Sequence, residues 1–192
     1  MGRAYKLMRV KKNHPGQLFP LFVLSDEPLP MHVYLTAKEG PKDSDGKVKS
    51  RLGPLAFRPG FHLSEVPLAT HIGAAEDGVI KYMHPDTVWC ECTYPEGINY
   101  QEEADLVGTV NGKVIKQKAC LKHVPVNGFY HFKTSPLMFG DWIISGGMEI
   151  ERILTDEDVA DILLPLGLAP QPRKEPIDLF SYGFKKMTCY SF

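Results

Sequence analysis

The segment from residue 53 to residue 64, GPLAFRPGFHLS, combines polar side chains with a backbone that regular structure cannot easily hold. Its prolines and glycines interrupt helix and strand geometry and give the chain an unusual path. His62 and Ser64 share one face if the segment ends as a strand, and Phe61 adds a ring beside them. Polar groups held next to aromatic rings are typical of a ligand pocket. The alternative is that His62 bonds to backbone groups and that Phe61 belongs to the core.

Three charged residues lie where strands are expected. Arg9 shares a strand face with Tyr5, and its guanidinium could bind a phosphate through two hydrogen bonds. Glu91 falls in the middle of an apolar strand, where a carboxylate needs a partner or a raised pKa. Asp141 precedes Trp142 at the start of another strand. Their alternatives are a salt bridge for Arg9, a solvated face for Glu91 and a turn for Asp141.

The cysteines allow a metal hypothesis that we weigh against a structural one. Cys90, Cys92, Cys120 and His123 could together supply four zinc ligands. Their spacing differs from that of zinc fingers, and two cysteines on one face of an apolar strand usually belong to the core. We therefore expect free thiols and no metal site.

Composition restricts the function further. The chain has 192 residues, 43% of them hydrophobic, and a formal net charge of -1, which fits one domain without a general affinity for nucleic acid. Residues 1–60 hold 11 basic and 5 acidic residues, a balance of +6, and the rest hold 11 and 18, a balance of -7. Nucleic acid is thus conceivable as a partner of the basic third, but lysines that solubilise loops are the simpler interpretation. P-loop, G-x-G-x-x-G, H-E-x-x-H and G-x-S-x-G motifs are absent.

No apolar run approaches the roughly 20 residues that cross a bilayer, and the first residues lack the apolar core of a signal peptide. We therefore expect a cytoplasmic protein without a membrane partner.

The elements that must position these residues are mostly short strands. Strong strand patterns cover Tyr5–Val10 and Thr87–Tyr94, weaker ones cover Leu18–Leu24 and Met31–Leu35, and Trp142–Ile144 with Met148–Leu154 is expected as a strand pair around Ser145-Gly146-Gly147. Asn111-Gly112 and Asn127-Gly128 are typical of tight hairpins. Pro67–Ala75 is expected as a short helix, and a second helix follows the N-cap Thr155. The predicted fold is α+β and mostly β.

The predicted domain covers residues 1–169. A proline-rich linker over residues 170–176 follows it, and an aromatic tail over residues 177–192 is expected to pack on the body or on a partner.

The order of these segments resembles that of a known family. A first strand carries Arg9, a glycine-rich aromatic segment runs from Arg58 to Ser64, and a strand follows with the sequence VWCEC and then YPEG. The strand pair after Asp141 closes the pattern. Over roughly residues 4–155, the order resembles the ADP-ribosyltransferase-like fold, a split antiparallel sheet, as in domains embedded in polyvalent proteins of phages and mobile elements.

The resemblance implies that NAD is the ligand, bound as a substrate, with a protein as the acceptor. Arg9 then contacts NAD, and Phe61, His62 and Ser64 shape the nicotinamide pocket. The family's catalytic glutamate falls where this chain has Asp141, one methylene shorter, and Glu91 is the other carboxylate candidate. The Q-x-E pattern at residues 101–103 comes too early in the strand order for this role.

The alternative function is that of a non-enzymatic accessory domain that binds protein or nucleic acid. An enzyme needs Arg9, His62 and Asp141 in one cleft, whereas a binding module leaves them apart.

Overall fold

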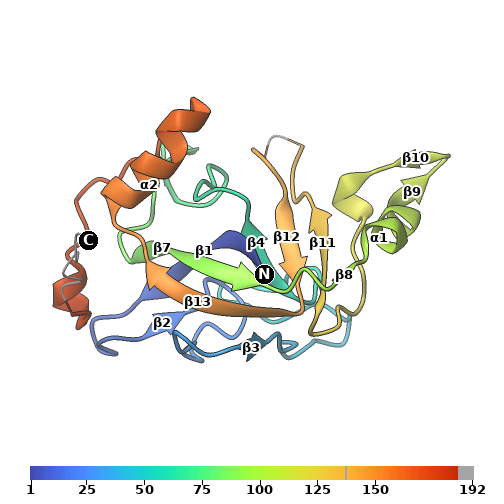
Figure 1. Cartoon of the computed structure of the whole chain (residues 1–192), viewed down its shortest axis with the longest axis horizontal. Helices are drawn as coiled ribbons and strands as arrows, with labels where there is room; N and C mark the ends of the chain where they lie inside the picture. The colour runs from blue at the N-terminus through green and yellow to red at the C-terminus, as the bar shows by residue number, and fades with distance from the viewer. Residues whose placement is uncertain (137, 186–192) are drawn as a thin grey trace.

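The computed structural model describes residues 1–136 and 138–185 and is mostly β (Figure 1). The strands are β1 (Gly2–Val10), β2 (Leu18–Phe19), β3 (Leu35–Thr36), β4 (Phe61–Ser64), β5 (Ala74–Glu76), β6 (Val79–Tyr82), β7 (Thr87–Tyr94), β8 (Ile98–Asn99), β9 (Thr109–Val110), β10 (Lys113–Val114), β11 (Gly128–Phe132), β12 (Trp142–Ser145) and β13 (Gly147–Ile153). The helices are α1 (Gln101–Gly108) and α2 (Asp156–Leu163), with short 3-10 helices at Lys116–Lys118, Leu164–Leu166 and Leu179–Tyr182.

Nine strands form one large sheet in the order β3-β13-β7-β1-β4-β12-β11-β8, with β2 paired to β1. The pairs are antiparallel except for β8 and β11, which run parallel, so the sheet is mixed rather than antiparallel as expected. The coarse prediction of an α+β, mostly β fold is confirmed.

The sheet has two halves that meet between β1 and β4. β1 pairs with β7 along its length, but it pairs with β4 only at Tyr5 and Ser64 before the two strands diverge. Figure 1 shows β1, β7 and β13 running across the molecule, while β4, β12 and β11 rise steeply from them. We call the meeting point of the two halves the junction.

The chain passes from one half of the sheet to the other at Gly146 and Gly147, between β12 and β13. β12 pairs with β4 and β13 pairs with β7, and only Gly146 separates them. The expected pairing of these two strands with each other is therefore wrong. A Cβ on Gly146 would collide with the carbonyl oxygen of Pro125, so only glycine fits where the chain bends.

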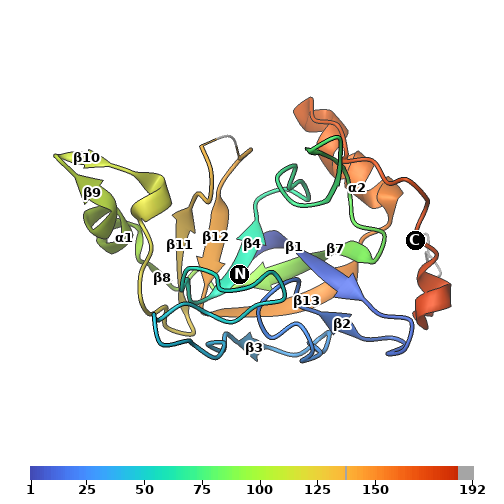
Figure 2. The ribbon, with the colours of Figure 1, turned by 180° about the vertical axis from the view of Figure 1, so that it is seen from behind.

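Alternation along the strands separates two apolar cores. On the first face Tyr5, Leu7, Trp89 and Trp142 pack with residues of α2 and of the segment after β4. On the second face the core lies against the segments around β2 and β3 and against the tail; its strand members include Met8, Cys90, Cys92, Ile143 and Ile150. Figure 2 shows α2 on one side of the sheet and β2 and β3 on the other.

Local signals account for α2 and for one hairpin. Thr155 caps α2 through a capping box with Asp158, as its sequence predicts. Asn111 and Gly112 have φ angles of 51° and 74° and join β9 to β10 in the expected hairpin.

Other local expectations are wrong because tertiary contacts decide them. Pro67–Ala75 forms turns followed by β5, which pairs with β6. Asn127-Gly128 does not close the expected hairpin. Gly128 is the first residue of β11, and β11 runs parallel to β8, the strand before it in the same part of the sheet. Strands were expected at Leu18–Leu24 and Met31–Leu35, but only the two residues of β2 and the two residues of β3 form strands in these regions.

The chain after α2 lies along the body. The carbonyl of Pro172 accepts a hydrogen bond from Met83, and Arg173 pairs with Asp156 at 3.0 Å. In the tail Leu179 and Tyr182 pack on the second core. The expected aromatic tail continues to residue 192, but residues 186–192 lie outside the described part.

Candidate functional site

A cross-strand row of side chains runs through the junction on the first face. Tyr5 pairs with Glu91 on one side and with Ser64 on the other, and Ser64 pairs with Trp142. Directly paired residues project to the same face of a sheet. The fold therefore aligns two predicted site residues, Glu91 and Ser64, although 27 positions separate them along the chain. Ser64 is only 1% exposed, however, and lies inside the core.

Two histidines contact the indole of Trp142 edge to face. The ring centroid of His62 is 6.3 Å from that of Trp142, and the centroid of His71 is 5.7 Å away. The Trp142 indole N–H donates to Thr134 Oγ1 at 2.9 Å. Nδ1 of His71 is buried and has no hydrogen-bond partner among the described residues. A buried polar atom without a partner is costly, so this nitrogen favours a ligand or water beside it.

His62 is held as a neutral imidazole. Burial and, to a lesser extent, the nearby positive charges of Lys6 and Arg58 together lower its pKa to about 3, against an opposing effect of the Gly60 carbonyl. That carbonyl lies 3.3 Å from Nδ1 of His62. Burial also lowers the pKa of His71. Both rings can therefore act as hydrogen-bonding groups without charge near neutral pH.

Arg58 completes this part of the junction. Its guanidinium carbon lies 5.0 Å from the ring centroid of Phe132, which pairs with Trp142 across β11 and β12. No carboxylate among the described residues pairs with Arg58. We call the group of Arg58, His62, His71 and Trp142 the junction site.

Sequence reasoning did not select His71, because it lay in a segment expected to be helical. Arg58 was quoted only as part of its motif. The turn-forming prolines and glycines around both residues were the available signal.

Glu91 belongs to an ion-pair network. It is 16% exposed and lies 3.2 Å from Arg3 and 3.1 Å from Arg152. Arg152 also pairs with Asp158 at the start of α2. Burial acts to raise the pKa of Asp158, but hydrogen bonds from Arg152 and Thr155 outweigh it and the pKa is lowered. The network thus ties three strands to α2 and supplies Glu91 with the partners that a carboxylate in a sheet needs.

Arg9 lies at the other end of β1. Its side chain is 13% exposed and pairs with Asp86 at 3.2 Å. Four strand positions separate it from Tyr5, which corresponds to about 13 Å. No hydrogen bond or ion pair within the described part of the chain joins Arg9 to the junction site.

Asp141 lies just before β12, outside the strand, and is held by ion pairs. Its carboxylate pairs with Lys116 at 2.7 Å and with Lys133 at 3.6 Å. Its backbone N–H donates to Glu65 at 3.0 Å. Arg9, His62 and Asp141 share no hydrogen bond or ion pair in the described part of the chain.

The cysteine–histidine zinc hypothesis is not supported. Cys90 and Cys92 lie in the second core, whereas Cys120 packs against the first core and His123 is exposed. Burial raises the pKa of Cys92 to about 12 and also raises that of Cys120, as expected for inert thiols. Within residues 1–136 and 138–185, the side chains that could hold a metal are His32, Glu149 and Glu151.

Two surface hollows lie away from the junction. One of about 390 Å³ is lined by apolar residues around β2 and by Phe184, and one of about 380 Å³ lies between residues 22–27 and 41–51. Neither includes a predicted site residue.

In the described part of the chain, the helices are too short and too polar to cross a bilayer. Comparison with known proteins finds no matching family model, no matching curated protein and no matching solved structure.

Proposed function

We propose that this chain is an NAD-binding protein with an ADP-ribosyltransferase-like arrangement, and that NAD binds at the junction site. The observation that carries the proposal is a pair of polar groups that lie against Phe132 and Trp142, two residues paired between β11 and β12. These are the guanidinium of Arg58, which has no carboxylate partner among the described residues, and the buried Nδ1 of His71.

The chemistry of these groups suits the two ends of a nicotinamide nucleotide. A guanidinium binds phosphate oxygens through two parallel hydrogen bonds, which fits the pyrophosphate. Neutral imidazoles offer one donor and one acceptor each, which fits the carboxamide of nicotinamide. Both imidazoles lie edge to face against the indole of Trp142, which is itself buried in the first core.

Transfer of ADP-ribose is not part of the proposal, because the carboxylates are poorly placed for it. A catalytic carboxylate must face the bond that breaks. Asp141 is held by two lysines, and Glu91 is held by two arginines. Glu91 is also three strands from Trp142, which corresponds to roughly 14 Å along the sheet. We therefore propose binding without transfer.

Calorimetric titration of the full chain with NAD tests this proposal. The wild-type chain should bind one NAD, and Arg58→Gln and His71→Phe should each weaken binding about tenfold, as expected for a lost hydrogen bond to a charged or buried group. Arg9→Gln is the matched control, because Asp86 holds that arginine away from the junction. Equal affinities in the wild type and both junction variants would refute the assigned site.

A second function, that of a non-enzymatic accessory domain that binds a protein, is favoured by one observation. The lobe of α1, β9 and β10 exposes Leu106 at 77% and Val107 at 57%, with Val114 at 48%. Contiguous exposed apolar patches are typical of interaction surfaces, and these three side chains come from two neighbouring elements, α1 and β10. Absence of NAD binding to the wild-type chain at millimolar concentration would leave this as the better-supported function.

A further inference from the structure

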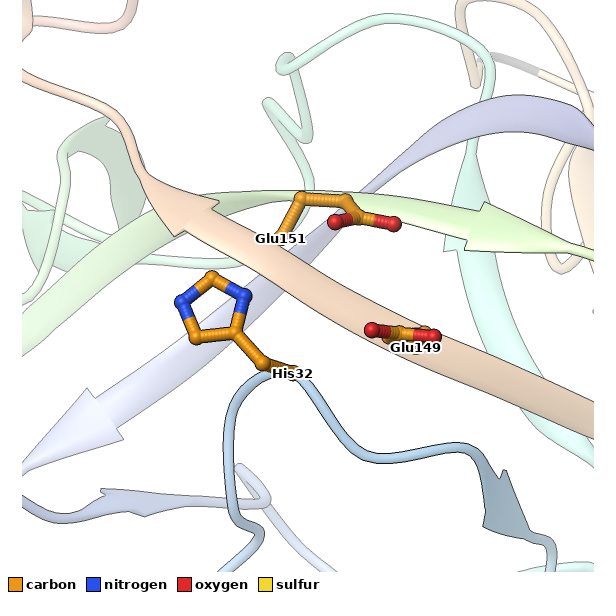
Figure 3. A group of neighbouring side chains, drawn as sticks. All are labelled: His32, Glu149 and Glu151. Atoms are coloured by element: carbon orange, nitrogen blue, oxygen red, sulfur yellow. The ribbon is translucent and has the colours of Figure 1, made fainter.

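A second group of side chains gathers at the edge of the sheet, away from the junction site. His32 comes from the loop before β3, and Glu149 and Glu151 come from β13 (Figure 3). One potential ligand atom from each residue lies within 4.8 Å of the others. We call this group the edge cluster.

The local structure of β13 directs both glutamates away from the second core. Pairing between β13 and β7 shifts register between Ile150 and Arg152, as at a β-bulge. The shift lets Ile150 and Ile153 both face the second core, although they are three positions apart. Glu151 can therefore stay on the side of Glu149, where the hydroxyl of Thr93 donates to Glu151 Oε1 at 2.8 Å.

The loop that carries His32 is anchored to the same strand. The His32 backbone N–H donates to the carbonyl oxygen of Ile150 at 2.9 Å. His32 has a φ of 58°, in the left-handed region. This backbone geometry brings the imidazole from the loop towards the two carboxylates (Figure 3).

The edge cluster carries negative charge that the described side chains do not neutralise. Neither Glu149 nor Glu151 has an ion-pair partner among the described residues. The neighbouring arginines Arg3 and Arg152 are both engaged by Glu91. Two carboxylates this close repel each other, and a cation between them would remove the repulsion.

We propose that His32, Glu149 and Glu151 bind one divalent transition-metal ion of the Zn²⁺ class. An imidazole with two carboxylates is a donor set that such ions accept, and three protein ligands leave a position for water. Ligand atoms around a tetrahedral ion lie about 3.4 Å apart, since each metal bond is about 2.1 Å long. Rotation of the exposed His32 side chain can close the remaining distance, and the Thr93 hydroxyl orients Glu151 from behind. This proposal is independent of NAD binding.

Titration of the full chain with Zn²⁺ and with Co²⁺ tests the edge cluster. We expect one Zn²⁺ per chain and a rise in the midpoint of thermal unfolding, because the ion links the loop to β13. His32→Asn and Glu151→Gln should each lower the affinity at least tenfold. Asparagine tolerates the left-handed backbone of His32 but removes the imidazole, so the fold is kept. His123→Asn, at an exposed histidine outside the cluster, is the matched control.

The Co²⁺ spectrum identifies the ligands. A site of one imidazole and two carboxylates gives d–d bands without the intense thiolate-to-metal charge-transfer band that cysteine ligation produces. A thiolate band in the wild type, or Zn²⁺ affinity that is the same in His32→Asn and in the wild type, would overturn the proposal. NAD affinity is measured separately, so failure of either site leaves the other proposal unaffected.

Discussion

Replacement of His62 by glutamine should remove a specific part of the pH dependence of folding. The pKa of this imidazole falls from an ordinary 6.5 to about 3 in the folded chain, first because of burial and then because of Lys6 and Arg58. The unfolded chain therefore binds a proton in this pH range that the folded chain does not. Stability due to this group is fully present above pH 6.5 and is lost progressively as pH falls from 6.5 towards 3.

The magnitude follows from the two pKa values. One pKa unit corresponds to about 1.4 kcal/mol, so the full difference amounts to about 2 kcal/mol at pH 5. Because the His62 ring is only partly buried, we expect the wild type to lose about 1–2 kcal/mol from this group between about pH 7.5 and pH 5. His62→Gln should lack this loss, since glutamine stays neutral and can still donate to the carbonyl of Gly60.

Urea unfolding at the two pH values, followed by circular dichroism, measures the effect. The comparison is between the pH-induced change in the free energy of unfolding of the variant and that of the wild type. His71 contributes in the same direction in both proteins and cancels in the difference. His123→Gln is the control and should keep the wild-type change. An equal pH-induced change in His62→Gln and in the wild type would refute the reasoning.

Further substitutions test the packing of the junction and the pH dependence that Lys6 confers. Gly60→Ala places a Cβ 2.7 Å from Cγ2 of Ile144 at a φ of 105°, so the free energy of unfolding should fall by about 1–3 kcal/mol. Gly46→Ala, at a φ of 73° with no atom within 4 Å of its Cβ, should cost less, and equal costs in urea unfolding would contradict the packing argument. Lys6 donates to the His62 carbonyl at 3.2 Å, and burial lowers its pKa to about 8. The unfolded chain then binds more protons between pH 8 and 10.5, so wild-type stability should rise over that range, and a persisting rise in Lys6→Met would show that another group is responsible.

The parts of the fold that were predicted correctly are those with local causes. Alternation of apolar residues specifies β1 and β7 because one strand position decides which face a side chain takes. The capping box at Thr155 and the Asn111-Gly112 turn involve atoms a few residues apart. These signals depend on residues within one element, so they do not depend on which other elements pack against it.

The errors concern elements whose partners are distant in the chain. Pro67–Ala75 contains residues that would suit a helix, but Leu68 and Ala69 pack into the first core as turns and Ala74 pairs in β5. β12 and β13 were expected to pair with each other, yet β4 and β7 already flank them. Propensity is a weak guide where tertiary contacts decide the outcome.

By itself the sequence determined the character of the chain and the candidates for chemistry. It indicated a mostly β protein, the strands of Arg9 and Glu91, and the unusual backbone before His62. These depend on residue type and on spacing within one segment, which the sequence states directly.

Only the tertiary structure decided which candidates meet. Long-range ion pairs hold Asp141 to Lys116 and Lys133, and the junction aligns Ser64 with Glu91 across Tyr5. The register shift in β13 brings Glu151 and Glu149 to the loop of His32. Strand order, register and bulges arise from long-range pairing between segments, and no local pattern encodes them.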